Sequence, residues 1–271
     1  MKRAIIFPGQ GINVPNTFED YTDNEQLNII AYEIYLLEQL KLLNINFDVT
    51  TGMSLGFYTS LYCSNVLDKN ALHKLILQRC KVMQDFKNTD CSMLAVYNVN
   101  LSTLKNICDS VSLDDSNKVY IANYNTSQCF TIAGTKLGLE RAKEKIFNVN
   151  GISVPLEVSD AFHTPYMSKA AGVFANIIKD TVFNNATIPL VANTTGKIIS
   201  SKDDILDSLI LHMDHSVLWY DSVITMISNG IDEFIEVGPN HILSNLIKRI
   251  DSSVKTISIS NENDIKNLRL E

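Results

Sequence analysis

Short apolar segments alternate with longer segments of helical periodicity along most of this 271-residue chain. Apolar runs at 3–7, 47–51, 188–192 and 233–237 predict buried strands, because a strand covered on both faces needs apolar side chains on each. Helices are expected between these runs, and the last helix at 241–250. The pattern favours an α/β fold in which a mostly parallel sheet carries helices on both faces.

The middle of the chain has a different rhythm. Strands are expected at 92–99, 118–124, 129–134 and 152–158, with helices at 101–111 and 136–149. This β-α-β-β-α-β order is the ferredoxin-like pattern. We therefore expect an inserted ferredoxin-like small subdomain at 91–156. Residues 1–90 and 157–271 would form an α/β-hydrolase-like, parallel-sheet large subdomain.

Composition excludes several classes of protein. The net charge of −7 argues against a nucleic-acid partner, because phosphate binding needs a basic face. No apolar stretch approaches the 18 residues of a membrane span, and the N-terminal apolar run is broken at Pro8 without a signal-peptide cleavage site. The five cysteines are odd in number and form no CxxC pair, so neither a disulfide framework nor a cysteine metal site is expected. A cytoplasmic protein fits these observations best.

The segment Gly52-Met53-Ser54-Leu55-Gly56 matches G-x-S-x-G and lies between a predicted strand and a predicted helix. This is the context of a nucleophile elbow, a tight turn that pushes the Ser54 hydroxyl out of the sheet edge. The N–H of Leu55 would then point into the site at a helix N-terminus, where negative charge is stabilised. By itself the pattern equally fits a Gly-Ser turn that caps a helix. The surrounding strand and helix favour the nucleophile.

A serine nucleophile needs a base, and five histidines are candidates: His73, His163, His212, His215 and His241. His163 follows a predicted strand and precedes a predicted helix, so it lies in a loop at the carboxyl edge where α/β sites are built. His73 falls within a predicted helix. His212 and His215 flank Asp214, but this group has no apparent third ligand, so we expect no metal site.

Several motifs together resemble one enzyme family. They are Phe7-Pro8-Gly9-Gln10-Gly11, Gly52-Met53-Ser54-Leu55-Gly56, Gln78-Arg79, Asn123-Tyr124-Asn125, Ala161-Phe162-His163, Asn193-Thr194-Thr195-Gly196 and Phe234-Ile235-Glu236-Val237-Gly238-Pro239. In this order, and over nearly the full chain, they resemble malonyl-CoA:acyl-carrier-protein transacylases and the acyltransferase domains of polyketide synthases.

The resemblance implies a mechanism. Ser54 would attack the thioester of malonyl-CoA while His163 takes its proton, and the N–H groups of Gln10 and Leu55 would hold the oxyanion. The malonyl group would then pass to the phosphopantetheine thiol of an acyl carrier protein. The protein itself would need no cofactor, since the phosphopantetheine belongs to the partner. The backbone carbonyl of His212, at a position where the family often has Gln, would orient the base.

Two further residues bear on the substrate. Arg79 matches the arginine of the family that binds the malonyl carboxylate, which a guanidinium can hold with two hydrogen bonds. From the residues alone, it would more simply be a surface arginine on an amphipathic helix. Phe162 resembles the variant associated with malonyl rather than methylmalonyl groups.

The chain also departs from the family pattern. Met53 stands where the family usually has His. Ser54 follows Gln10 by only 44 positions, whereas relatives place several dozen more residues there. This shortening favours a free-standing acyltransferase that serves a polyketide synthase lacking its own, and we expect the protein to be a monomer. Its carrier protein would be either stand-alone or part of a polyketide synthase, in fatty acid or polyketide synthesis.

Three other functions compete with malonyl transfer. An editing hydrolase of the same fold would cleave acyl groups from carrier proteins, but a carboxylate clamp at Arg79 would not help it. A general serine esterase would need an acid between Ser54 and His163, and none is recognised. A carrier-protein-binding module without catalysis would have no need of the Ser54 and His163 pair.

Overall fold

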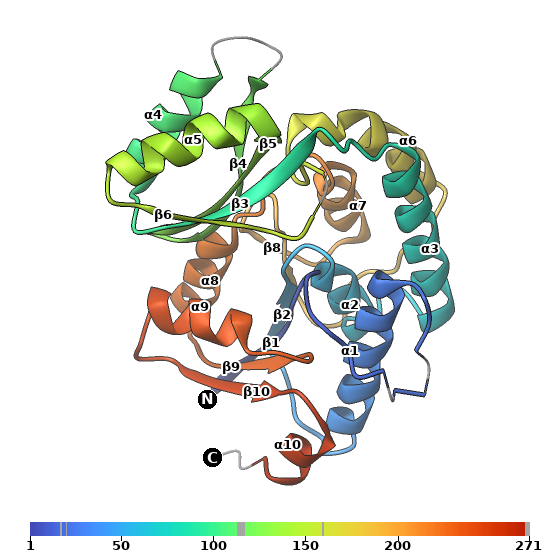
Figure 1. Cartoon of the computed structure of the whole chain (residues 1–271). Helices are drawn as coiled ribbons and strands as arrows, with labels where there is room; N and C mark the ends of the chain where they lie inside the picture. The colour runs from blue at the N-terminus through green and yellow to red at the C-terminus, as the bar shows by residue number, and fades with distance from the viewer. Residues whose placement is uncertain (17, 20, 113–116, 159, 269–271) are drawn as a thin grey trace.

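The computed structural model describes residues 1–16, 18–19, 21–112, 117–158 and 160–268. Within them a six-stranded sheet lies below a four-stranded one (Figure 1). The larger sheet has the order β10-β9-β1-β2-β7-β8, and only β7 and β8 pair antiparallel. These strands are Lys255–Ile259, Ile231–Val237, Lys2–Phe7, Val49–Gly52, Leu190–Val191 and Ile198–Ile199.

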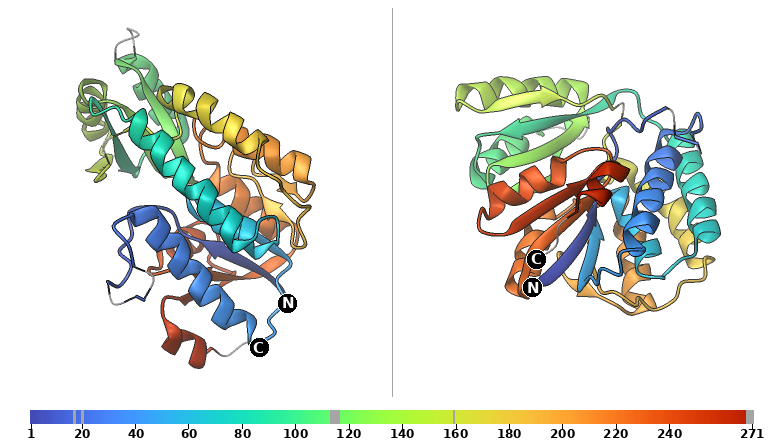
Figure 2. Two further views of the ribbon diagram at one scale, coloured as in Figure 1. Left: turned by 90° about the vertical axis from the view of Figure 1, so that its right-hand side faces the viewer. Right: turned by 90° about the horizontal axis from the view of Figure 1, so that it is seen from below.

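Helices cover both faces of the larger sheet (Figure 2). On one side lie α1 (Glu25–Lys41), α2 (Gly56–Cys63), α3 (Lys69–Asp85), α6 (Ser168–Lys179) and α7 (Lys202–Leu211), and on the other α8 (Trp219–Ser228) and α9 (Ile242–Ile250). Strand β1 shows why both faces are covered, since it has apolar side chains on each. Ala4 and Ile6 pack toward α8 and α9, while Ile5 and Phe7 pack toward α1. The predicted parallel sheet with two covered faces is confirmed.

The smaller sheet is antiparallel, in the order β4-β5-β3-β6. Its elements follow the chain as β3 (Cys91–Tyr97), α4 (Leu101–Val111), β4 (Val119–Thr126), β5 (Cys129–Thr135), α5 (Lys136–Asn148) and β6 (Ile152–Pro155). This is the ferredoxin-like order. The sheet joins the rest of the molecule through β4, where Tyr124 N–H donates to the Val217 carbonyl at 2.9 Å. The division at 91–156 stays a proposal.

The sequence interpretation was wrong at the C-terminal end. It placed the final helix at 241–250, but strand β10 and helix α10 (Glu262–Lys266) follow. The run Lys255–Ile259 alternates polar and apolar residues, which is typical of a half-exposed edge strand and gives a weak signal. Strand β6 ends at Pro155 rather than at 158.

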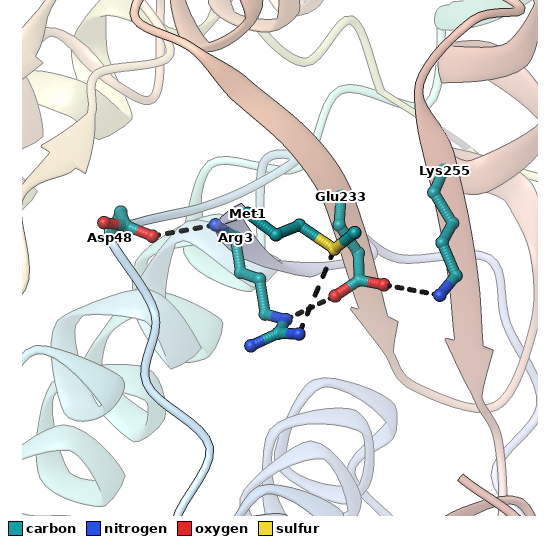
Figure 3. A network of polar contacts seen from close by, with 5 residues as sticks. All are labelled: Met1, Arg3, Asp48, Glu233 and Lys255. Atoms are coloured by element: carbon teal, nitrogen blue, oxygen red, sulfur yellow. Dashed lines mark hydrogen bonds and ion pairs between the residues drawn. The ribbon is translucent and has the colours of Figure 1, made fainter. Parts of the chain in front are cut away.

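A buried carboxylate ties three strands together at their amino ends (Figure 3). Glu233 on β9 accepts a hydrogen bond from Arg3 on β1 and forms an ion pair with Lys255 on β10 at 3.0 Å. Burial raises the pKa of Glu233, but these two cations outweigh it and hold the pKa below its ordinary value. On the other side of β1, Asp48 accepts from the Arg3 N–H at 2.8 Å. The contacts hold β9, β1 and β10 in register at the end opposite to the predicted nucleophile.

A side chain at Gly56 should disrupt the fold. A Cβ there would lie 2.2 Å from the Phe7 carbonyl oxygen and 2.3 Å from that of Pro8. We expect Gly56→Ala to lower the free energy of unfolding by about 3 kcal/mol or more, since backbone cannot yield as a side chain can. Gly172→Ala is the control. It has nothing within 4 Å of the new Cβ and should raise stability by up to about 1 kcal/mol. Urea unfolding of both variants measures this, and equal stabilities would contradict it.

Candidate active site

Ser54 occupies the turn between β2 and α2 in a left-handed backbone conformation, with φ of 52°. Few residues other than glycine adopt this conformation, so the turn is strained in the manner of a nucleophile elbow. Glycines on either side make it possible. A Cβ on Gly52 would lie 2.0 Å from the Gly56 carbonyl carbon, so neither position accepts a side chain. The sequence prediction of a strand, a tight turn and a helix matches the described geometry.

The hydroxyl of Ser54 lies 2.7 Å from Nε2 of His163. On the other side of the ring, Nδ1 of His163 lies 3.0 Å from the backbone carbonyl oxygen of His212. A carbonyl oxygen can only accept, so Nδ1 carries the hydrogen and Nε2 presents its lone pair to Ser54. The structure therefore brings Ser54, His163 and His212 together in the order that a nucleophile, its base and an orienting group require.

His163 is 5% exposed, and its pKa is lowered to about 4. Burial is the main cause and the positive charge of Arg79 adds to it, while hydrogen bonds with the backbone at His212 and His215 oppose the shift. The imidazole is therefore neutral at pH 7. A neutral imidazole is the form that can take a proton from a serine hydroxyl.

The other histidines and the nearby acid do not compete for this role. His73, His215 and His241 are exposed, and His215 pairs with its neighbour Asp214 at 2.7 Å. The Asp160 carboxylate accepts from the N–H groups of Ala161 (2.9 Å) and Asn88 (3.3 Å), so it holds the loop before His163 rather than the imidazole.

Gln10 and Leu55 lie on the two backbone segments that meet at the elbow. Leu55 follows Ser54 at the start of α2. The loop after β1 passes so close that a Cβ on Gly9 would lie 2.8 Å from the Met53 carbonyl oxygen. Within the described residues, the N–H groups of Gln10 and Leu55 donate to no other group. Two N–H groups free to donate beside a nucleophile are what an oxyanion hole needs.

Arg79 is buried in helix α3, with only 3% of its surface exposed. One Nη1 hydrogen bond goes to Oε1 of Gln26 on α1, and the guanidinium lies over the Tyr58 ring at 5.4 Å from its centroid. Among the described residues no carboxylate pairs with Arg79, and its Nε has no hydrogen-bond partner. A buried cation without an anion is unusual, because its burial costs free energy unless it is paired. The interpretation of Arg79 as a surface residue is wrong.

Phe162 is partly buried where the large core meets the inner face of the small sheet, packed against both. Met53 packs on the opposite side, against the core of α8 and α9. A cleft of about 490 Å³ opens beside His163, between β4 and the loop that carries His215. Its walls include neither Ser54 nor Arg79.

Two residues escaped assignment from the sequence. Asn193 accepts a hydrogen bond from the Ser54 N–H at 2.9 Å, and Gln26 holds Arg79. Asn193 stands in one of the motifs that carry the resemblance, so a signal was present. Gln26 looks like any polar residue on the first turn of a helix.

The described residues contain no group of three or more His, Cys, Asp or Glu side chains that could hold a metal ion. In the same part of the chain, no helix is both long and apolar enough to cross a membrane.

Fold and site together define a class: an α/β protein with a serine at a nucleophile elbow and a neutral histidine as its partner. No family model matches the chain. The malonyl CoA-acyl carrier protein transacylase of Bacillus subtilis (strain 168) is 30% identical over 267 residues, which is 97% of this chain and 82% of that protein. The chain belongs to the malonyl CoA-acyl carrier protein transacylase family.

Solved structures agree with this assignment. The malonyl CoA-acyl carrier protein transacylase from Clostridium perfringens superposes with a TM-score of 0.90 and 25% identity, covering 98% of this chain and 96% of that one. A malonyl-transacylase solved in complex with its type II PKS acyl-carrier protein has a TM-score of 0.91, covers 98% of each chain and is 22% identical, so it supports the fold alone.

The low pKa of His163 predicts how the reactivity of Ser54 depends on pH. Protonation removes the base, so labelling of Ser54 by a fluorophosphonate should be fast at neutral pH and fall as the pH drops through about 4. Arg79→Met removes a positive charge that lowers this pKa, so the midpoint should move to higher pH. Mass spectrometry gives the rate of labelling, over the pH range in which circular dichroism shows that the protein stays folded. A wild-type midpoint near 6.5, or no shift in the variant, would contradict the assigned base.

Proposed function

We propose that this protein transfers a malonyl group from malonyl-CoA to the phosphopantetheine thiol of an acyl carrier protein, through an ester on Ser54. This is the [acyl-carrier-protein] S-malonyltransferase reaction. The observation that carries the proposal is the buried cation Arg79, which pairs with no carboxylate among the described residues and lies close to a Ser54–His163 pair. A malonyl group differs from most acyl groups in having a free carboxylate, which is the anion that Arg79 lacks.

In the first half-reaction, Ser54 Oγ attacks the thioester carbonyl carbon while Nε2 of His163 takes the hydroxyl proton. The N–H groups of Gln10 and Leu55 stabilise the oxyanion that forms. The carbon–sulfur bond then breaks, and the CoA thiolate leaves with the proton from His163. The product is malonyl-Ser54 and free CoA.

The second half-reaction reverses these roles. His163 takes the proton of the carrier's thiol, and the thiolate attacks the ester carbonyl carbon. The same N–H groups hold the oxyanion. The carbon–oxygen bond breaks, and Ser54 Oγ recovers a proton from His163. The His212 carbonyl accepts the hydrogen bond from Nδ1 of His163 throughout and so favours the protonated imidazole. This carbonyl takes the place of an acidic third residue.

Arg79 selects the substrate in this scheme. Gln26 and Tyr58 hold the guanidinium from two sides, so its remaining N–H groups are oriented before the substrate arrives. A charge-assisted pair with the malonyl carboxylate would contribute about 1.5–3 kcal/mol, which is about 10–100-fold in preference over an uncharged acyl group. Phe162, on the loop that carries His163, would limit room for a branched malonyl group.

The partners follow from the reaction. Malonyl-CoA is the donor and an acyl carrier protein, stand-alone or within a polyketide synthase, is the acceptor. The enzyme would act as a monomer in the cytoplasm without a cofactor of its own, in fatty acid or polyketide synthesis. Residues 91–156 would form the small subdomain, and 1–90 with 157–271 the large one.

An editing hydrolase of the same fold is the alternative. It would release acyl groups to water, and it would have no use for a cation that binds a free carboxylate. The Arg79 environment and the family assignment both favour transfer.

Ser54→Ala tests the acyl carrier directly. Wild-type protein incubated with malonyl-CoA should gain one malonyl mass, and Ser54→Ala should gain none because the attacking oxygen is gone. Intact-protein mass spectrometry reads the result, and Ser102→Ala, an exposed serine on α4, is the matched control. A wild-type protein that hydrolyses acyl thioesters without ever carrying the adduct would favour the hydrolase.

Arg79→Ala tests substrate selection. We expect kcat/KM for malonyl-CoA to fall about 10–100-fold while acetyl-CoA is transferred at least as well as by wild type, because only malonyl has the carboxylate. Lys81→Ala removes an exposed charge from the same helix and should change neither value. An unchanged preference for malonyl in Arg79→Ala would remove the clamp from the mechanism.

A further inference from the structure

The side chain of Asn193 is fully buried and forms hydrogen bonds with the turn that carries the nucleophile. Asn193 follows β7, and its Nδ2 donates to the carbonyl oxygen of Gly52 at 2.8 Å. Its Oδ1 accepts from the N–H of Ser54 at 2.9 Å. One partner can only accept and the other can only donate, so the orientation of the amide is determined. Asn193 therefore holds the backbone on both sides of the strained residue.

His212 contacts the same amide with its side chain. Its Nε2 lies 3.2 Å from Oδ1 of Asn193, and because that oxygen only accepts, Nε2 must be the donor. Burial, and then the repulsion that a second protonated imidazole would meet from His163 and the positive charge of Arg79, hold the pKa of His212 well below its ordinary value. The ring is therefore neutral, with its single hydrogen on Nε2. Its Nδ1 has no hydrogen-bond partner within the described residues.

These contacts close a ring of hydrogen bonds. Ser54 Oγ bonds to Nε2 of His163, and Nδ1 of His163 bonds to the His212 carbonyl. The His212 side chain bonds to Asn193, and Asn193 returns to the Ser54 backbone. The main chain of His212 thus orients the base, while its side chain is tied to the turn that holds the nucleophile.

We propose that Asn193 and the His212 side chain are a positioning pair, which holds the backbone of Ser54 in its left-handed conformation and sets the distance from Ser54 Oγ to His163. The pair touches no reacting atom and acts through Ser54 and His163. The inference rests on the proposed function only in that malonyl transfer is the reaction that Ser54 and His163 perform.

Geometry explains why such a pair affects rate rather than substrate binding. The left-handed conformation of Ser54 is disfavoured, so a bond to its N–H helps to keep the hydroxyl facing the imidazole. A small displacement of a reacting group costs a large factor in rate. The malonyl carboxylate meets Arg79, which neither residue contacts through a hydrogen bond, so KM should change little.

Two substitutions at His212 form the main test, since both keep the backbone carbonyl. His212→Gln supplies an amide that can still donate to Asn193, whereas His212→Leu supplies no donor and fills the space. We expect His212→Leu to lower the rate of Ser54 acylation by malonyl-CoA about 10-fold, with KM within about twofold, and His212→Gln to stay within about threefold of wild type. Rapid quenching followed by intact-protein mass spectrometry gives the rate, and melting temperatures show that both variants fold.

The second test asks whether the two residues act as one unit. Asn193→Ala should lower the acylation rate by about 100-fold. The double variant with His212→Leu should be no slower than Asn193→Ala alone, because the ring is already open. If Asn193→Ala does not fold, the His212 variants carry the test.

The outcomes separate the two proposals. Labelling of Ser54 by a fluorophosphonate, which phosphonylates an activated serine and releases fluoride, needs no malonyl group. Wild-type protein that is labelled but takes no malonyl from malonyl-CoA would overturn the proposed function, and the variants could still be compared by labelling. A wild-type rate in His212→Leu, no rescue by His212→Gln, or multiplicative losses in the double variant would overturn the positioning pair.

Discussion

The close approach of the start of α2 to the end of β1 determines most of this site. The Met53 N–H donates to the Phe7 carbonyl at 2.9 Å, and Gly56 lies against the same carbonyl. With a side chain at Gly56 these two backbones could not meet, and the Gln10 loop could not pass over the elbow. One packing constraint therefore brings the nucleophile and both candidate oxyanion donors together, since they all lie on these two segments.

The electrostatics of the site follow from burial without an acidic partner. Serine triads commonly stabilise the protonated histidine with a carboxylate, but here a backbone carbonyl takes that place. Burial and the charge of Arg79 keep His163 neutral, which leaves its Nε2 free to accept a proton. A malonyl carboxylate bound to Arg79 would offset part of that positive charge. Binding of the proposed substrate would thus make the base stronger at the moment it is needed.

Residues with a local signal could be assigned from sequence, and residues that act through distant contacts could not. Ser54 stands in a turn motif between a strand and a helix, and His163 in a loop at the sheet edge. Gln26 holds Arg79 across 53 positions, and Asn193 holds Ser54 across 139. A polar residue gives no indication of which distant group it contacts. The missed strand β10 has the same cause, since an edge strand needs its neighbour to be recognised.

The sequence by itself determined the alternation of strands and helices, the ferredoxin-like insertion pattern and the strained turn at Ser54, because periodicity and glycine placement are local properties of the chain. Only the tertiary structure decided that Arg79 is buried with no anion beside it in the described part of the chain, which tautomer His163 adopts, and that Asn193 and His212 close the ring of hydrogen bonds around Ser54. Burial, pKa and hydrogen-bond partners depend on segments far apart in the sequence, and folding alone brings those segments into contact.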